Sequence, residues 1–262
     1  MPFTLAHPAV VLPFARPLAR WRLLSAAVIG SMAPDVGWFF PWRPPRFETH
    51  SADALLTFCL PVGLATYWIF QRVIRTPVLE LLPPAAYARW RESAAPADYA
   101  SLKQWVFAAL GVLAGAVTHL VWDAFTHEGA RGLRLLPTLE DRAVDFGGLH
   151  LSGAHLLQDA NSLAGLIVVF AVLAYGLRPA RGVHPPVARR LQAPERWVWI
   201  GGFVLIAALL SVVFYFMRHH ALPASRVVVP VNATAIAILR GLAAAMIVTS
   251  VCLNARLRLS PG

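Results

Sequence analysis

The chain is poor in cysteine and in charge, and these two shortages exclude whole classes of protein. Its two cysteines, Cys59 and Cys252, lie within apolar runs, so they form neither a disulfide framework nor a CxxC metal site. Charged residues make up only 14% of the 262 residues, against 58% hydrophobic residues and a mean hydropathy of +0.59. A chain this apolar is not an ordinary soluble domain, and we interpret it as a membrane protein.

The chain also lacks the features of nucleic-acid-binding and secreted proteins. Its net charge of +10 comes from 23 basic against 13 acidic residues, and the basic ones fall mostly between apolar runs, where lipid headgroups lie. No soluble basic face is available for nucleic acid, so the expected partner is the lipid bilayer. Because no basic residue precedes an apolar core at Met1–Pro8, we expect no cleavable signal peptide and expect His7 to be retained.

Five apolar runs are long enough to cross a hydrocarbon core of about 30 Å. They cover approximately residues 52–74, 105–125, 155–177, 197–217 and 227–253. Ahead of them, Pro34 and Asp35 interrupt an apolar stretch at 21–40, because proline breaks a helix and aspartate is costly in lipid. The predicted fold is all-α: a polytopic integral-membrane helix bundle of about five transmembrane spans, with an N-terminal buried or interfacial helical segment.

We expect residues 1–262 to form a single membrane domain. Within it, residues 1–50 are the N-terminal segment that bears ligands, residues 52–177 hold spans one to three with the site, and residues 197–253 hold spans four and five.

A row of metal-competent side chains ends the second span. His119, Asp123 and His127 recur at i, i+4 and i+8, which keeps them within about 80° of arc on one helix face. Neighbours in the row lie about 6 Å apart along the axis, so His119 and Asp123 can share one ion while His127 reaches a second. The alternative is that the three residues cap and hydrogen-bond a helix end in the interfacial region.

The alternation of spans predicts where further ligands lie. His7, Asp35 and His50 precede span one, the row ends span two, and a second i, i+4 pair begins span three, so all lie at one membrane face. We therefore expect one polar cluster there, and its eight members are His7, Asp35, His50, His119, Asp123, His127, His155 and Asp159. For the last two, the alternative is a helix N-terminal turn that hydrogen-bonds to span two.

Several short blocks carry a resemblance to a known family. The opening Pro2-Phe3-Thr4 with His7-Pro8, the block Gly30-Ser31-Met32-Ala33-Pro34-Asp35, and Thr49-His50 resemble an uncharacterised bacterial integral-membrane family. It is one of the domain-of-unknown-function families and is grouped with predicted membrane-bound metal-dependent hydrolases. The likeness covers most of the first 170 residues, and it implies a multi-pass protein of the bacterial inner membrane.

The order of the ligands is also similar to that of the zinc-dependent phospholipase C and single-strand zinc nuclease superfamily. That order is His, Asp, His, then His-x-x-x-Asp with a further His, then His-x-x-x-Glu. The last carboxylate is Asp159 here, and six residues precede His7, whereas in the superfamily the mature N-terminal residue itself ligates metal. The resemblance implies one metal on Asp35, His50, His119 and Asp123, a second on His127, His155 and Asp159, and a third on His7 with bridging oxygens from Asp123 and Asp159.

Imidazole and carboxylate ligands without thiolate suit zinc, with manganese and iron as alternatives. Two or three such ions would lower the pKa of a bound water toward about 7 and neutralise charge on a phosphoryl oxygen. Asp35 or Glu128 is expected to take the proton. Arg131 and Arg134 are expected to bind a substrate phosphate, although a role as headgroup-facing loop arginines is the alternative.

The expected function is therefore that of an integral-membrane metal-dependent hydrolase of phosphoester bonds in a lipid or membrane-proximal substrate. The alternative is a non-enzymatic membrane protein with a structural or regulatory metal site. An open coordination position would favour the enzyme, and a closed four-ligand site would favour the structural role.

The numbers of basic residues on the two predicted membrane faces are nearly equal. With five spans, ten basic residues fall on the site face, among them Arg16, Arg20 and Arg22, against twelve on the opposite face. The compact loop at 178–196 holds five arginines and favours a site that faces away from the cytoplasm.

Overall fold

The computed structural model describes residues 3–40, 44–84, 86–87, 90, 100–126, 132, 135, 143–146, 149–178, 191–220 and 231–259. Within these residues the secondary structure is helical apart from one short hairpin, so the predicted helical class is confirmed. The hairpin pairs β1 (Ala143–Phe146) with β2 (Leu149–Ser152) antiparallel, with Ala143 opposite Ser152. The sequence did not predict this pairing.

Four helices are long and apolar enough to cross a membrane, which indicates a membrane protein. They are Leu102–Thr126, Gly153–Leu177, Ala193–Met217 and Thr234–Arg258. These helices coincide with the second to fifth predicted spans. The first predicted span, 52–74, is helical but alternates between α and π segments, and the count of five spans is not confirmed.

The chain divides into two compact units. Unit 1 comprises Met1–Trp68 and Ala95–Gly176, and unit 2 comprises Ile69–Ala94 and Leu177–Gly262. The expectation that residues 1–262 form a single membrane domain stays a prediction. The elements that begin in unit 1 are the 3-10 helices η1 (Thr4–Ala6), η2 (Leu12–Phe14) and η3 (Ala33–Phe39), the π-helix η4 (Leu55–Cys59), and the α-helices α1 (Pro8–Val11), α2 (Ala15–Arg20), α3 (Leu24–Gly30), α4 (Arg46–Thr49), α5 (Leu60–Ile69), α8 (Leu102–Thr126) and α10 (Gly153–Leu177). Unit 2 holds the π-helix η5 (Phe70–Ile74), α6 (Arg75–Leu81), α11 (Ala193–His220) and α12 (Val231–Leu259).

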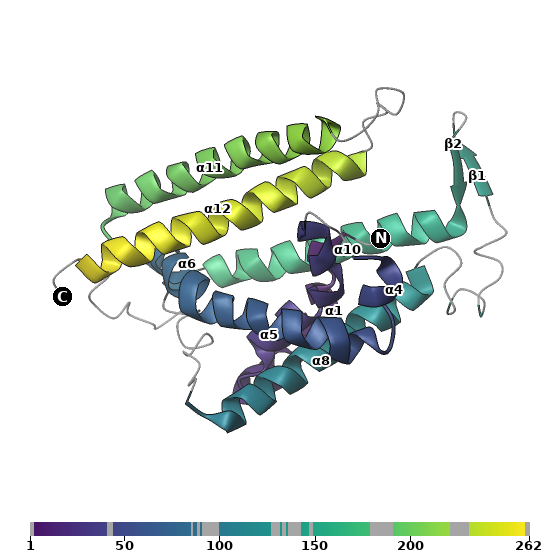
Figure 1. Ribbon diagram of the computed structural model, residues 1–262, viewed down its shortest axis with the longest axis horizontal. Coiled ribbons are helices and arrows are strands. Elements are labelled where there is room, and N and C mark those ends of the chain that lie inside the picture. Colours follow the sequence, from purple (N-terminus) through teal and green to yellow (C-terminus); the bar gives the residue numbers. More distant parts are fainter. Residues whose placement is uncertain are drawn as a thin grey trace. The chain divides into compact units, whose positions relative to one another are not determined.

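In unit 2, α11 and α12 lie side by side (Figure 1). Gly241 approaches Ala207 and Ser211 so closely that a Cβ there would overlap the Ser211 hydroxyl, while Leu191 packs with Leu253 near the other end of the pair. These contacts make the two helices antiparallel.

In unit 1, α3 packs tightly along α8 through small residues. A Cβ at Gly115 would overlap the carbonyl oxygen of Ala27, and a Cβ at Gly30 would overlap that of Val112. Gly111 and Gly115 form a GxxxG motif, the pattern that lets helix backbones approach closely in membranes. The contacts advance in the same direction along both helices, so α3 runs parallel to α8 and ends beside the metal-competent row.

The π and α segments from Leu55 onward run antiparallel to α8. Cys59 packs with Ala116, and Gly63 lies against Val112. One turn further, Tyr67 accepts a hydrogen bond of 3.3 Å from Gln104. This stretch therefore begins level with the row and leads toward the N-terminal end of α8.

The N-terminal segment folds as a helical hairpin, with α2 leading away from the row and α3 returning. The turn is at Arg22, whose φ of 58° is left-handed, and the Leu23 N–H donates to the carbonyl of Leu18 at 2.8 Å. At this turn the ring of Trp21 meets that of Phe107 edge to face, with centroids 6.1 Å apart. Phe107 lies about 18 Å along α8 from His119, at 1.5 Å per residue.

This hairpin corrects the placement expected for Arg16, Arg20 and Arg22. They were expected on the site face, but α2 carries them to the other end of α8. The expectation was wrong because it assumed that everything before the first span stays at one face. Segments of a few residues with interspersed prolines and arginines leave no span-length apolar signal, so hydropathy could not reveal the hairpin.

Candidate metal centre

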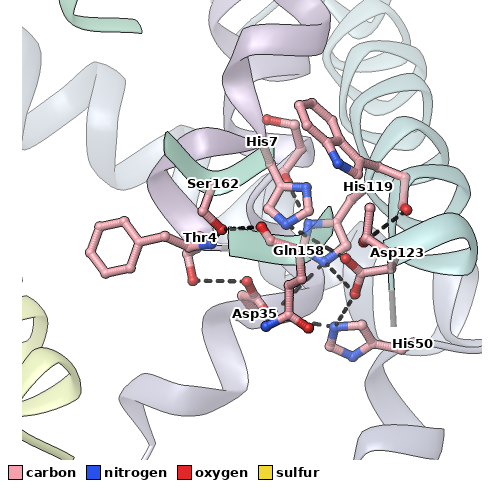
Figure 2. A network of polar contacts seen from close by, with 12 residues as sticks. Thr4, His7, Asp35, His50, His119, Asp123, Gln158 and Ser162 are labelled. Atoms are coloured by element: carbon pink, nitrogen blue, oxygen red, sulfur yellow. Dashed lines mark hydrogen bonds and ion pairs between the residues drawn. The ribbon is translucent and has the colours of Figure 1, made fainter. Parts of the chain in front are cut away.

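Five of the eight expected ligands meet in one buried cluster of unit 1. His119 and Asp123 come from α8, Asp35 from η3, His50 from the turn after α4, and His7 from the junction of η1 and α1 (Figure 2). Relative exposure is 0% for Asp35 and His119, 1% for His7 and 4% for Asp123, and the His50 side chain is 6% exposed. Three imidazoles and two carboxylates are therefore buried together.

Four of the side chains bring one atom each toward a common point. His50 Nε2 lies 3.4 Å from Asp35 Oδ1 and 3.7 Å from Asp123 Oδ2. His119 Nε2 lies 4.0 Å from the same Asp35 oxygen and 3.5 Å from the same Asp123 oxygen. Four atoms placed tetrahedrally about 2.1 Å from one ion lie roughly 3.4 Å from one another, and these histidine–aspartate distances are close to that value. The groups whose ligand atoms all lie within 4.8 Å of one another are Asp35, His50 and His119, and His7, His119 and Asp123.

Hydrogen bonds on the far side of each ligand orient it. His119 Nδ1 lies 2.7 Å from the carbonyl oxygen of Ser31, which can only accept, so Nδ1 carries the proton and Nε2 presents a lone pair to the cluster. The hydroxyl of Thr49 contacts His50 Nδ1 at 2.6 Å. Thr4 donates to Asp35 Oδ2 at 2.8 Å, which leaves Oδ1 facing the histidines.

Several ligand atoms find no hydrogen-bond partner within the described part of the chain. They are both ring nitrogens of His7, Oδ1 of Asp35, Nε2 of His50 and Nε2 of His119. A buried polar atom without a partner costs free energy of about 1–3 kcal/mol. Several such atoms gathered in one buried cluster are the arrangement expected of a site that binds ions.

His7 lies on the other side of Asp123. Its ring stacks on that of His119 with centroids 3.6 Å apart, and its Nε2 is 3.7 Å from Asp123 Oδ1. Asp123 thus directs one oxygen toward His7 and the other toward His50 and His119. Asp123 can therefore offer one oxygen on each side.

Electrostatics keep these groups in their ligand forms. His7 and Asp35 both lie outside the four candidate spans. Burial, aided by repulsion from His119, lowers the pKa of His7 from 6.5 to about 3, so its imidazole is neutral at pH 7. Burial alone would raise the pKa of Asp35, but His50, His119, His7 and Thr4 outweigh it and hold that pKa below its usual range. A carboxylate ionised this firmly suits a ligand better than the proton acceptor also expected of Asp35.

His155 and Asp159 are not brought into the cluster. Both are exposed on α10, the ring of His155 contacts the Ser152 hydroxyl at 3.1 Å, and neither belongs to the groups of described residues able to hold a metal. α10 contacts the N-terminal segment through another face, which carries Ser162 and Gly165 and not His155 or Asp159. Ser162 accepts a hydrogen bond from the Phe3 N–H at 3.0 Å, and a Cβ at Gly165 would lie 2.7 Å from that of Ala6.

The remaining predicted residues cannot be placed. His127, Glu128, Arg131 and Arg134 lie outside the described residues. The second ligand set, which requires His127, therefore stays a prediction, as do the roles of Glu128 in proton transfer and of the two arginines in phosphate binding.

Gln158 is a site residue that sequence reasoning missed. It lies one turn before Ser162, whose hydroxyl donates to its carbonyl oxygen at 2.8 Å, and its side chain points toward the cluster in Figure 2. The i, i+4, i+7 spacing of Gln158, Ser162 and Gly165 was the available signal, since two polar residues and a glycine on one face of an apolar helix mark a close, hydrogen-bonded contact.

Comparison with known proteins places the chain in a family but attaches no activity to it. Nothing among the curated proteins or the solved structures matches it. The expected kinship with an uncharacterised family is confirmed, whereas the hydrolase grouping stays a prediction. The model of the family described as Domain of unknown function (DUF4184) matches residues 1–251, and the chain therefore belongs to that family.

Proposed function

We propose that this chain is an integral-membrane, metal-dependent hydrolase that cleaves phosphoester bonds in a lipid or membrane-proximal substrate. The observation that carries the proposal is the buried set of three histidines and two aspartates, with ligand atoms 3.4–4.0 Å apart and hydrogen bonds behind them. Burying so many ionisable groups among apolar helices is costly unless they bind an ion.

The residues fit a divalent cation. Nitrogen and oxygen donors without thiolate suit zinc, manganese or iron. Asp35, His50 and His119, whose ligand atoms all lie within 4.8 Å of one another, would hold the first ion, with Asp123 beside the two histidines. His7 and the second oxygen of Asp123 would contribute to another. When bound, such ions supply Lewis acidity and water activated at neutral pH. The chain's own residues orient the ligands and keep bulk water out.

The depth of the cluster supports a lipid or membrane-proximal substrate. His119 lies about 10 Å along α8 from the end of the helix at Thr126, at 1.5 Å per residue. The cluster therefore lies nearer one end of this candidate span than its middle, on the side of one membrane surface. The similarity of ligand order to the zinc-dependent phospholipase C superfamily supports phosphoester chemistry at that level.

We also place the protein in the bacterial inner membrane as a multi-pass protein with five spans. The helical stretch that begins at Leu55 supplies the additional span, and it is supported by its antiparallel course along α8 from Cys59 to Tyr67.

A structural or regulatory metal site is the second candidate. Four protein ligands around one ion would close a tetrahedral site and leave no position for substrate. The location of His7 beside the second oxygen of Asp123 favours the enzyme, because it extends the ligand set beyond one closed ion.

The test is to measure metal content and phosphodiester hydrolysis on the same purified protein. We expect about two equivalents of zinc, manganese or iron, and hydrolysis of bis(p-nitrophenyl) phosphate that Asp123→Asn abolishes together with metal binding. Asp53→Asn, which changes an exposed aspartate three residues after His50, is the matched control and should leave both unchanged. One bound equivalent without hydrolysis would support the structural role, and a protein that binds no metal would refute both.

A further inference from the structure

Unit 1 has a second polar surface at the end of α8 remote from the metal cluster. It consists of Arg16, Arg20, Trp21, Arg22 and Lys103, which we call the basic end. All five side chains are exposed, and Trp21 has 61% of its surface accessible. None of them contributes to the candidate metal centre.

Contacts between the helical hairpin and α8 hold these residues together. Trp21 packs edge to face on Phe107, and the Lys103 Nζ lies 5.7 Å from the centroid of the same ring. Arg16 and Arg20 follow one another by one turn of α2, and the surface around them is hollowed. Three cations and an indole are thus gathered at the turn of the hairpin, beside the lysine at the start of a candidate span.

This composition fits the headgroups of anionic lipids. Tryptophan prefers the membrane–water interface, and guanidinium groups pair with phosphate oxygens. The turn itself does not account for Arg22, because a left-handed φ of 58° favours glycine. The exposed guanidinium of Arg22 is instead suited to pair with a lipid phosphate.

The basic end also changes the charge distribution expected from sequence. Arg16, Arg20 and Arg22 were expected at the membrane face of the metal cluster, but they lie with Lys103 at the remote end of α8. Among the described residues of unit 1, these four cations stand against Arg46, which begins α4. The described cations of unit 1 therefore gather at the end remote from the cluster.

Cations flanking spans are retained in the cytoplasm, and the first segment usually dominates this bias. We propose that the basic end anchors the protein in the cytoplasmic leaflet by binding anionic phospholipid headgroups, and that the metal cluster consequently lies toward the opposite, extracytoplasmic side. The proposal is independent of whether the cluster catalyses a reaction.

Thiol accessibility in intact cells tests the orientation. In a chain carrying Cys59→Ala and Cys252→Ala, single cysteines are placed at Asp53, an exposed residue three positions after His50, and at Leu102, at the basic end and 78% exposed. A membrane-impermeant maleimide should label Asp53→Cys in intact cells and Leu102→Cys only after permeabilisation. Labelling of Leu102→Cys in intact cells would overturn the proposal. A second pair, Glu48→Cys and Pro17→Cys, reports the same two ends if either cysteine disturbs folding.

The lipid class is tested on the purified full chain in detergent micelles. Adding phosphatidylglycerol should raise the thermal midpoint more than adding phosphatidylcholine, and the triple variant R16Q/R20Q/R22Q should lose this difference. Arg46→Gln, which removes one cation from the first residue of α4, should retain it. An equal response to both lipids in the unmodified chain, or a full phosphatidylglycerol response in the triple variant, would contradict headgroup binding at the basic end.

Discussion

At the scale of single residues, the cluster depends on groups that do not themselves face its centre. Thr4 holds one oxygen of Asp35, the Ser31 carbonyl fixes the tautomer of His119, and Thr49 contacts His50. Such partners position a ligand before an ion arrives, so removing one loosens the geometry without deleting a ligand.

We predict that Thr4→Val lowers zinc affinity by about 10–100-fold, because Asp35 loses the hydrogen bond that directs Oδ1 at the histidines. The measurement is a zinc titration in competition with a chelator of known affinity. Thr57→Val is the matched control, since the exposed hydroxyl of Thr57 donates to the Asp53 carbonyl in the preceding turn and to no ligand of the cluster. Equal losses in the two variants would mean that general destabilisation, not ligand orientation, is responsible.

His7 predicts a dependence of stability on pH in the metal-free protein. Its folded-state pKa of about 3 lies below the ordinary value of 6.5, so the unfolded chain takes up a proton first as the pH falls. The stabilisation is complete above pH 6.5 and is lost toward pH 3, by at most about 1.4 kcal/mol per pH unit.

Unfolding of metal-free protein followed from pH 7 to pH 4 should therefore show a shallower pH dependence for His7→Gln than for the unmodified chain. His155→Gln removes an exposed histidine and should leave the slope unchanged. A slope that His7→Gln does not alter would show that another group controls acid stability.

At the scale of elements, the contact between α3 and α8 determines where the ligands meet. Gly115 has no room for a Cβ beside the Ala27 carbonyl, and Ser31 follows directly after α3. We predict that Gly115→Ala forces the helices apart, destabilises the protein by roughly 1–3 kcal/mol, and weakens zinc binding because the Ser31 carbonyl moves away from His119.

Gly201→Ala is the control for that substitution. Gly201 lies in the middle of α11 with nothing within 4 Å of an added Cβ, so alanine there should be neutral or stabilising by up to about 1 kcal/mol. Thermal midpoints and zinc affinities of both variants provide the comparison. If Gly115→Ala binds zinc as tightly as Gly201→Ala does, the α3–α8 contact does not position the site.

Much of the site could be predicted from sequence because it depends on short-range rules. The i, i+4 spacing of His119 and Asp123 and the alternation of spans were sufficient to bring Asp35, His50 and His7 to the same end of α8. Each rule concerns one helix or one crossing, and neither requires knowledge of which helix faces which.

The rotation of α10 could not be predicted in this way. The pairs His155 with Asp159 and Gln158 with Ser162 share the same spacing, so periodicity alone does not choose between them. The choice is made by the close approach of Gly165 to Ala6, which brings together residues about 160 positions apart in the chain.

At the scale of the whole molecule, a bound ion would link regions that are widely separated in the chain. Its ligands come from α8, from η3, from His50 after α4 and from the N-terminal segment. The unfolded chain cannot present these ligands together, so binding free energy is transferred to folding. A cation present at 100 times its dissociation constant stabilises the folded state by about 2.7 kcal/mol.

We predict that chelation of the purified protein lowers its thermal midpoint and that zinc restores it, with a shift of roughly 5–10 °C for a chain of this size. Asp123→Asn should unfold at a midpoint that neither chelator nor zinc moves, because Asp123 faces His7, His50 and His119 at once. Asp53→Asn should respond as the unmodified chain does. A midpoint that zinc raises equally in Asp123→Asn would place the stabilising ion elsewhere in the molecule, whereas a response confined to chains that retain Asp123 would tie the fold of unit 1 to the occupancy of its buried cluster.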